Sequence, residues 1–288
     1  MDSRSETTPR APPAIEVDVL PNDEREQERL DLVHYIFRTT LDGDLCYTKL
    51  ENPQKILDVG TGTGIWAIEI GNEYPSAEVI GTDLSPIQPG CGGNTATGLA
   101  VPPNVQFQVD DATHEWTFPT ASFDFIHIRT LYGAISDWPA LLRECYKALK
   151  PGGQVEIAEM RTKFFCDDGS YPQDSAMQLV VDEIDRISRS VGLELDVSPF
   201  IPDWLKAAGF KEVEQAARPV PVGTWPKDRK MKQLGYYMVA QIIETALDSF
   251  TIALFTRHGG YTEEQVRVLG NRARDEMKTN KLHVYTKL

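Results

Sequence analysis

Three glycines alternate with other residues in the segment Asp58-Val-Gly60-Thr-Gly62-Thr-Gly64. The segment stands between an apolar run typical of a strand and an amphipathic run typical of a helix. Glycines at such a turn let the backbone approach a ligand, and the following helix presents free N–H groups. A tight turn without a ligand would need only one glycine, and each further glycine costs conformational entropy. The segment therefore predicts a bound ligand.

A dinucleotide is disfavoured as that ligand, because Ile65 takes the place of the third glycine in the fingerprint G-x-G-x-x-G. Carboxylates follow successive predicted strands. Asp58 can accept hydrogen bonds from loop N–H groups, and Asp83 stands where an acidic residue binds the two hydroxyls of a ribose. Asp111 and the backbone of Ala112 are placed to contact an adenine. Together they predict an adenosine ligand that needs no pyrophosphate.

The elements that must position these residues form an α/β pattern, in which short apolar runs alternate with helical segments from Lys55 onward. The carboxyl ends of parallel strands share one edge of the sheet, where open α/β sheets bind ligands. The fourth strand delivers His127, Arg129 and Tyr132 towards that edge. The expected strands are 55–60, 78–84, 105–111, 123–129 and 154–160, with helices at 64–74 and 138–149 and Pro151-Gly-Gly ending the second helix.

The pattern changes on both sides of this predicted sheet. An amphipathic helix at 28–41 needs a partner surface, and the Pro- and Gly-rich stretch 86–103 predicts an irregular loop beside the ligand. Beyond residue 160 we expect helices at 175–191, 203–208, 229–256 and 263–279 and a strand at 212–222. The chain thus divides into a polar tail at 1–14, a helical segment at 15–50, a ligand-binding core at 51–162 and a helical cap with the remaining strands at 163–288.

Composition excludes several classes of protein. The 288 residues include 43 acidic and 29 basic side chains, a formal charge of −14, which repels phosphate backbones and anionic lipids. No apolar run approaches the roughly 18 residues that cross a membrane, and the N-terminus has no apolar signal core. We expect a cytoplasmic protein without nucleic-acid or membrane partners. No C-x-x-C pair occurs among Cys46, Cys91, Cys145 and Cys166, so no metal site is expected.

Five motifs taken in order resemble those of class I S-adenosylmethionine-dependent methyltransferases, across roughly residues 50–162: DVGTGTG, TDLSP, DDA, FDFIHIR and LKPGG. More narrowly, the chain is similar to the fungal LaeA-like methyltransferases over most of its length after residue 15. The pieces that carry this similarity are NDEREQERLDLVH, TGIWAIEI, DLSPIQP, SDWPALLRE, PVPVGTWPKD and NKLHVY. Relative to the family pattern, residues 90–100 look like an insertion, and a longer final strand than one ending at Leu288 is expected.

The resemblance implies a Rossmann-like sheet, an added helical cap and S-adenosyl-L-methionine as cofactor. It places the three glycines at the methionine part of the cofactor, with Asp58 near its amino group. Asp83 would bind the ribose hydroxyls. The cofactor contacts that it implies are Asp58, Gly60, Thr61, Gly62, Gly64, Asp83, Leu84, Asp111, Ala112 and Arg129.

The acceptor side is less defined. No catalytic residue is predicted, because methyl transfer is an in-line displacement in which alignment supplies much of the acceleration. A hydrogen-bonded core histidine is favoured over a base for His127, and Arg129 and Tyr132 are expected in the pocket wall. Glu159, at the end of the fifth strand, either contacts the acceptor or is a solvated strand end. Tyr236 and Tyr237 at helical spacing favour core over an aromatic pocket.

Two functions stay open. The first is a methyltransferase acting on a small molecule, in secondary metabolism as the resemblance suggests. The second is a methyltransferase-like regulator of secondary metabolism that works through protein partners in the nucleus. An NAD-dependent oxidoreductase disagrees with the glycine spacing, and the acidic balance opposes nucleic-acid methylation.

Overall fold

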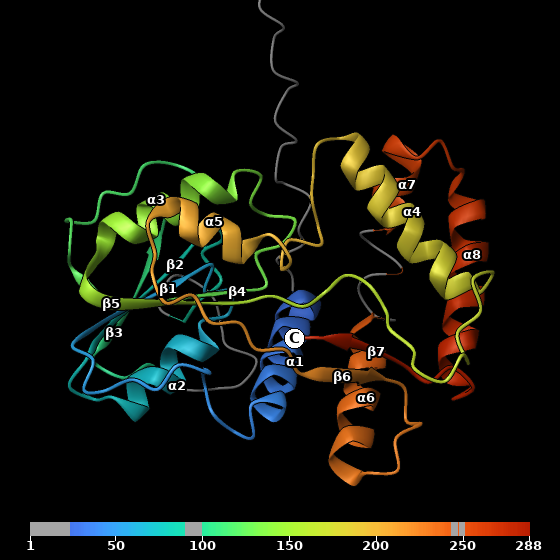
Figure 1. Ribbon diagram of the computed structural model, residues 1–288, viewed down its shortest axis with the longest axis horizontal. Coiled ribbons are helices and arrows are strands. Elements are labelled where there is room, and N and C mark those ends of the chain that lie inside the picture. Colours follow the sequence, from blue (N-terminus) through green and yellow to red (C-terminus); the bar gives the residue numbers. More distant parts are fainter. Residues whose placement is uncertain (1–23, 90–99, 243–246, 248–250) are drawn as a thin grey trace, which may run out of the picture.

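A five-stranded parallel sheet forms the centre of the molecule. The computed structural model of the chain describes residues 24–89, 100–242, 247 and 251–288. The strand order is β3-β2-β1-β4-β5, and every neighbouring pair is parallel (Figure 1). This confirms the α/β Rossmann-like sheet. The strands are β1 (Lys55–Val59), β2 (Glu78–Asp83), β3 (Val105–Val109), β4 (Phe123–Arg129) and β5 (Leu149–Ala158).

The central strands are buried on both faces, as parallel strands covered by helices must be. On one face α2 (Ile65–Glu73) packs through Trp66 and Ile70 onto alternate residues of β1, β2 and β4. On the other, α3 (Trp138–Ala148) and α5 (Ile201–Ala208) form a second apolar layer. The helices lie on opposite sides of the sheet in Figure 1. The sheet is therefore the middle of three layers, with helices above and below it. The carboxyl ends of the strands are followed by loops.

The remaining elements pack together around a third apolar cluster beside the sheet (Figure 1). Helix α1 packs against α6, and α4 against α7 and α8. β6 and β7 form an antiparallel pair. Helix α1 comes from the N-terminal segment expected at 15–50, and the others come from the segment 163–288. The elements of this group are α1 (Glu24–Thr40), α4 (Ala176–Ser190), α6 (Arg229–Gln241), α7 (Thr251–His258), α8 (Glu263–Lys278), β6 (Pro219–Val222) and β7 (Val284–Lys287).

Several boundaries differ from the sequence predictions. The helix expected at 229–256 is described as α6 and α7, with 243–246 and 248–250 outside the described residues. The strand expected at 212–222 is paired only from Arg218 to Val222, where β7 and Leu288 supply backbone partners. The segment Pro151-Gly-Gly does not lie after the helix as a turn, since β5 begins directly at Leu149 and includes it. The tail at 1–14, Cys91 and most of the loop at 86–103 lie outside the described residues. In the ranges that the structure describes, no helix is long and apolar enough to cross a membrane.

Candidate active site

The loop after β1 needs glycine for both conformation and packing. Gly60, Gly62 and Gly64 have φ values of 67°, 57° and 80°, in the left-handed region that L side chains rarely adopt. A Cβ at Gly60 would stand 2.4 Å from a methyl group of Leu131, and one at Gly64 would stand 2.5 Å from the ring of Phe107. Only glycine therefore fits at these two positions without a shift of its neighbours. We call the loop 60–64, at the carboxyl edge of the sheet, the cradle.

Asp58 holds this loop to the neighbouring strand. Its side chain is buried, and one carboxylate oxygen accepts a hydrogen bond from the Thr61 hydroxyl at 2.6 Å. The other lies 2.7 Å from Nδ1 of His127 on β4. The His127 ring is 1% exposed and stacks on Trp66 with centroids 3.7 Å apart. The interpretation of His127 as a core histidine is confirmed, and both Asp58 oxygens have partners within the protein.

Asp83 joins the cradle from the end of β2. Its carboxylate accepts hydrogen bonds from the backbone N–H of Gly62 at 2.8 Å and of Ser85 at 3.0 Å. Burial raises the pKa of Asp83, because a low-dielectric environment disfavours the charged form. Asp83 thus lies against the glycine loop, and its binding of ribose hydroxyls stays a prediction.

Gln88 is a site residue that sequence reasoning missed. Its amide nitrogen donates to the carbonyls of Gly62 at 2.7 Å and Ser85 at 2.9 Å, and its side chain is 1% exposed. Its amide oxygen has no partner among the described residues. Gln88 therefore ties the β2 loop to the cradle. Gln88 lies in the segment DLSPIQP that carries the family resemblance, but its residue type predicts no contact, so the folded loop is needed to identify its partners.

Helix α1 contacts the cradle, while its apolar face packs against α6 in the apolar cluster beside the sheet, which is the partner surface that the sequence required. Asp31 accepts a hydrogen bond from the Thr63 hydroxyl at 2.8 Å, and burial raises the pKa of Asp31. A Cβ at Gly62 would lie 3.3 Å from Leu30. Neither Asp31 nor Leu30 was predicted as a site residue, because the contact joins segments more than 30 residues apart.

Arg129 faces α1. Its guanidinium lies 3.2 Å from Nδ1 of His34 and over the ring of Phe37 at 5.1 Å. An arginine can only donate, so Nδ1 of His34 accepts and its Nε2 donates to Glu69 at 3.0 Å. His34 is therefore neutral, in agreement with the burial that lowers its pKa. Burial also lowers the pKa of Arg129, to about 10. The described contacts of Arg129 tie β4 to the cap.

The residues that the sequence predicts at the adenine lie in a separate turn after β3. The Asp111 carboxylate accepts hydrogen bonds from the Thr113 backbone and hydroxyl at 2.9 and 2.7 Å. The backbone N–H of Asp110 bonds the carbonyl of Asp83 at 3.0 Å, which brings this turn beside the β2 end. Leu84 is 50% exposed and Ala112 half-buried. An apolar, open position thus lies next to Asp83.

Tyr132 and Glu159 follow β4 and β5, on the side of the cradle opposite to β2. Glu159 is 5% exposed, and one oxygen accepts the backbone N–H of Leu131 at 2.7 Å. The other has no partner among the described residues. Burial raises the pKa of Glu159 to about 8 and also raises that of Tyr132. The alternative of a solvated strand end is wrong for Glu159, since the side chain is buried beside the loop that packs on Gly60.

Tyr236 and Tyr237, on helix α6, differ in how far they are exposed. Tyr236 is 61% exposed, so the preference for a core position is wrong there, while Tyr237 is half-buried and stacks edge-on against Tyr35. Across the described ranges, no group of three or more His, Cys, Asp or Glu side chains could hold a metal ion.

Comparison with known proteins identifies the family to which this sheet and cradle belong. Residues 24–215 match the methyltransferase-domain family. The chain belongs to this family. It is an S-adenosylmethionine-dependent methyltransferase.

Methyltransferase pytC from Aspergillus terreus is 39% identical to this methyltransferase over 265 residues, which cover 91% of this chain and 78% of pytC. The secondary metabolism regulator LAE1 from Cochliobolus heterostrophus is 33% identical over 279 residues, covering 93% and 86%. Among solved structures, phosphoethanolamine N-methyltransferase 2 of Haemonchus contortus, in complex with phosphomonomethylethanolamine and S-adenosylhomocysteine, superposes with a TM-score of 0.53 at 18% identity. The match covers 96% of this chain and 60% of that structure's chain, and it shows the shared fold.

Proposed function

We propose that this methyltransferase transfers the methyl group of its cofactor to a small-molecule acceptor of secondary metabolism. The observation that carries the proposal is the burial of Glu159, which leaves one carboxyl oxygen without a partner beside the cradle. A carboxyl enclosed to this degree offers no open surface to a folded macromolecule, which favours a small acceptor. The identities to methyltransferases pytC, tdiE and cpsF, of 39%, 29% and 29%, support it.

The residues present fit the cofactor. The loop between β1 and α2 presents backbone without side chains at its three glycines, and the Asp83 carboxylate lies against it at the end of β2. In our proposal Gly60, Thr61, Gly62 and Gly64 hold the methionine part. Asp83 binds the ribose hydroxyls, and Leu84, Asp111 and Ala112 contact the adenine. Asp58 and Arg129 support the site by holding the protein groups around it, since their described contacts are with protein groups.

When bound, the cofactor supplies an electrophilic methyl group on a sulfonium centre. The chain's part is alignment, because two reactants held in line gain most of the available acceleration. Glu159 is placed to contact an acceptor hydroxyl or amine at the oxygen that has no described partner. Because burial raises its pKa to about 8, the carboxyl is mostly protonated at neutral pH and would donate a hydrogen bond to the acceptor. Tyr132 would line the acceptor side of the pocket.

The direct test is transfer of a labelled methyl group from S-adenosylmethionine to a metabolite extract from a fungus that makes secondary metabolites. The proposal predicts a labelled small molecule, and Asp83→Ala should reduce the labelling at limiting cofactor concentration. Tight cofactor binding without transfer to any metabolite would contradict it.

A regulatory function is the second candidate, favoured by the 33% identity to the regulator LAE1 across 93% of this chain. In that function the methyltransferase would work through protein partners in the nucleus. A partner recovered equally well by the wild-type chain and by Asp83→Ala, together with a normal phenotype of Asp83→Ala, would favour it over the enzymatic function.

A further inference from the structure

Two side chains hold the same pair of backbone residues, Gly62 and Ser85, from opposite ends. The N–H of Gly62 donates to one oxygen of Asp83 at 2.8 Å, and the N–H of Ser85 donates to the other at 3.0 Å. The carbonyls of the same two residues both accept from the amide nitrogen of Gln88, at 2.7 and 2.9 Å. Four hydrogen bonds therefore link these four residues in a closed ring, which we call the carboxylate ring.

The carboxylate ring fixes which way the Gln88 amide faces. A carbonyl oxygen can only accept, so the amide nitrogen must face Gly62 and Ser85, and it uses both of its hydrogens there. The Gln88 side chain is 1% exposed, so bulk solvent does not compete for these hydrogens. Loss of a buried donor leaves its acceptor unsatisfied, which costs more than the loss of an exposed hydrogen bond.

The two N–H groups that donate to Asp83 come from different loops, one after β1 and one after β2. A backbone hydrogen bond from Thr61 to the carbonyl of Thr82, at 2.8 Å, joins the same two segments independently of Gln88. The segments would therefore stay together without Gln88. What its loss would change is the orientation of the two peptide groups, and with it the orientation of the carboxylate that they hold.

Asp83 keeps capacity to accept hydrogen bonds from a ligand. A carboxylate offers about four lone-pair sites on its two oxygens, and each oxygen accepts one backbone N–H within the ring. Two neighbouring hydroxyls, as on a ribose, match two oxygens held at a fixed angle, because each hydroxyl can donate to one of them. A carboxylate free to rotate must be ordered on binding, and that ordering lowers affinity.

We propose that Gln88 is a positioning residue for the cofactor, which holds the Asp83 carboxylate in the orientation that receives both hydroxyls of the ribose. Gln88 acts through Gly62 and Ser85, without a contact of its own to the cofactor. The inference rests on the proposed binding of the ribose by Asp83. The effect of Gln88 on affinity must then depend on the ribose hydroxyls, which the effect of a residue that only stabilises the loops would not.

The test compares the binding of S-adenosylhomocysteine and of its 2′-deoxy analogue by calorimetry, in the wild type, Gln88→Met and Asp83→Ala. Methionine is unbranched, as glutamine is, and carries no N–H donor in its side chain. We expect the wild type to bind S-adenosylhomocysteine about tenfold more tightly than the analogue, which lacks one hydroxyl. Gln88→Met should reduce this preference to about threefold or less, and Asp83→Ala should nearly abolish it.

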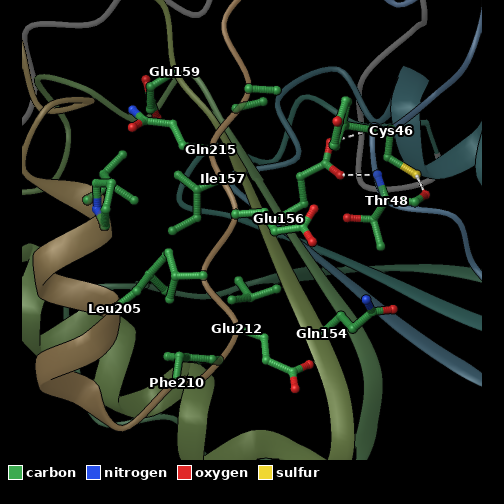
Figure 2. Close-up of a pocket in the computed structure, with 18 of the residues that line it drawn as sticks. Cys46, Thr48, Gln154, Glu156, Ile157, Glu159, Leu205, Phe210, Glu212 and Gln215 are labelled. Atoms are coloured by element: carbon green, nitrogen blue, oxygen red, sulfur yellow. Dashed lines mark hydrogen bonds between the residues drawn. The ribbon is translucent and has the colours of Figure 1, made fainter.

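Gln154→Met is the matched control. Gln154 is an exposed glutamine of β5, and Figure 2 shows it and Glu159 at opposite ends of the labelled residues from this strand. This variant should keep the wild-type preference. Gln88→Asn keeps the amide but is one methylene shorter, so it cannot reach both carbonyls and should lose the preference as Gln88→Met does. Urea unfolding identifies which of the variants are folded, and either Gln88 variant is sufficient for the test.

The possible results separate the inference from the proposal on which it rests. A folded Gln88 variant that binds both ligands more weakly by the same factor would make Gln88 a structural residue and overturn the inference. Wild-type affinities in that variant would overturn it as well. A wild type that binds the two ligands equally would instead contradict the contact between Asp83 and the ribose, and Asp83→Ala would then show no change in preference either.

Discussion

At the scale of single residues, the site depends on carboxylates whose surroundings assign them different tasks. Asp58 is buried with both oxygens bonded to protein groups, and Asp83 accepts backbone N–H groups of the loops that flank it. Glu159 keeps one oxygen without a described partner. The sequence predicted Asp58 and Asp83 because their positions after strands carry the signal. It left Glu159 open, because burial depends on segments remote in the chain.

Asp83→Ala should weaken S-adenosylmethionine binding by about 1 to 3 kcal/mol, because ribose hydroxyls would lose their charged acceptor. Calorimetric titration measures the change. Asp203→Ala, on an exposed surface of α5, is the control and should bind as the wild type does. Unchanged affinity in Asp83→Ala would remove this residue from the site.

Glu159 should make the folded chain lose stability as pH rises. Its pKa is raised to about 8 by burial, above the roughly 4.3 of an unfolded glutamate. The native state therefore binds more protons than the unfolded state between these values, so its stability falls with rising pH by at most about 1.4 kcal/mol per pH unit. Urea unfolding at pH 5.5 and pH 8 should show a larger loss in the wild type than in Glu159→Gln. Equal losses would place the carboxylate in a solvated environment.

At the scale of elements, α1 and the glycine loop act as one unit. The pattern of α1 predicted an amphipathic helix that needs a surface. The structure supplies α6 and the apolar cluster beside the sheet for its apolar face, and the cradle and α2 for its polar contacts. The identity of that surface could not be predicted, because helical periodicity records which face is apolar and nothing about its partner. Gln88 was missed for a related reason, since its two carbonyl partners are set by loop conformation.

The hydrogen bond between Asp31 and Thr63 should couple α1 to cofactor binding. Asp31→Ala and Thr63→Ala should each lower the affinity by about 0.5 to 1.5 kcal/mol, because either removes the link that holds the loop under the helix. A double-mutant cycle measured by calorimetry should show that the two changes are not additive. Strict additivity would mean that the contact has no part in forming the cradle.

At the scale of the whole molecule, the sheet and the cap differ in how far the sequence predicts them. Five strands and the helices around them follow from local alternation of apolar runs, and their boundaries agree within a few residues except at the start of β5. The strand at 212–222 follows the same local pattern, yet only its last part pairs. A strand forms where a neighbour supplies hydrogen bonds, which local propensity does not record.

Calorimetric titration of the purified chain tests whether this cradle binds S-adenosylmethionine. S-adenosylmethionine, S-adenosylhomocysteine and NAD are titrated under the same conditions. We predict that both adenosyl ligands bind with micromolar or better affinity and that NAD does not, because Ile65 stands where a dinucleotide loop has its third glycine. Binding of NAD, or of none of the three, by a chain shown to be folded would contradict the account.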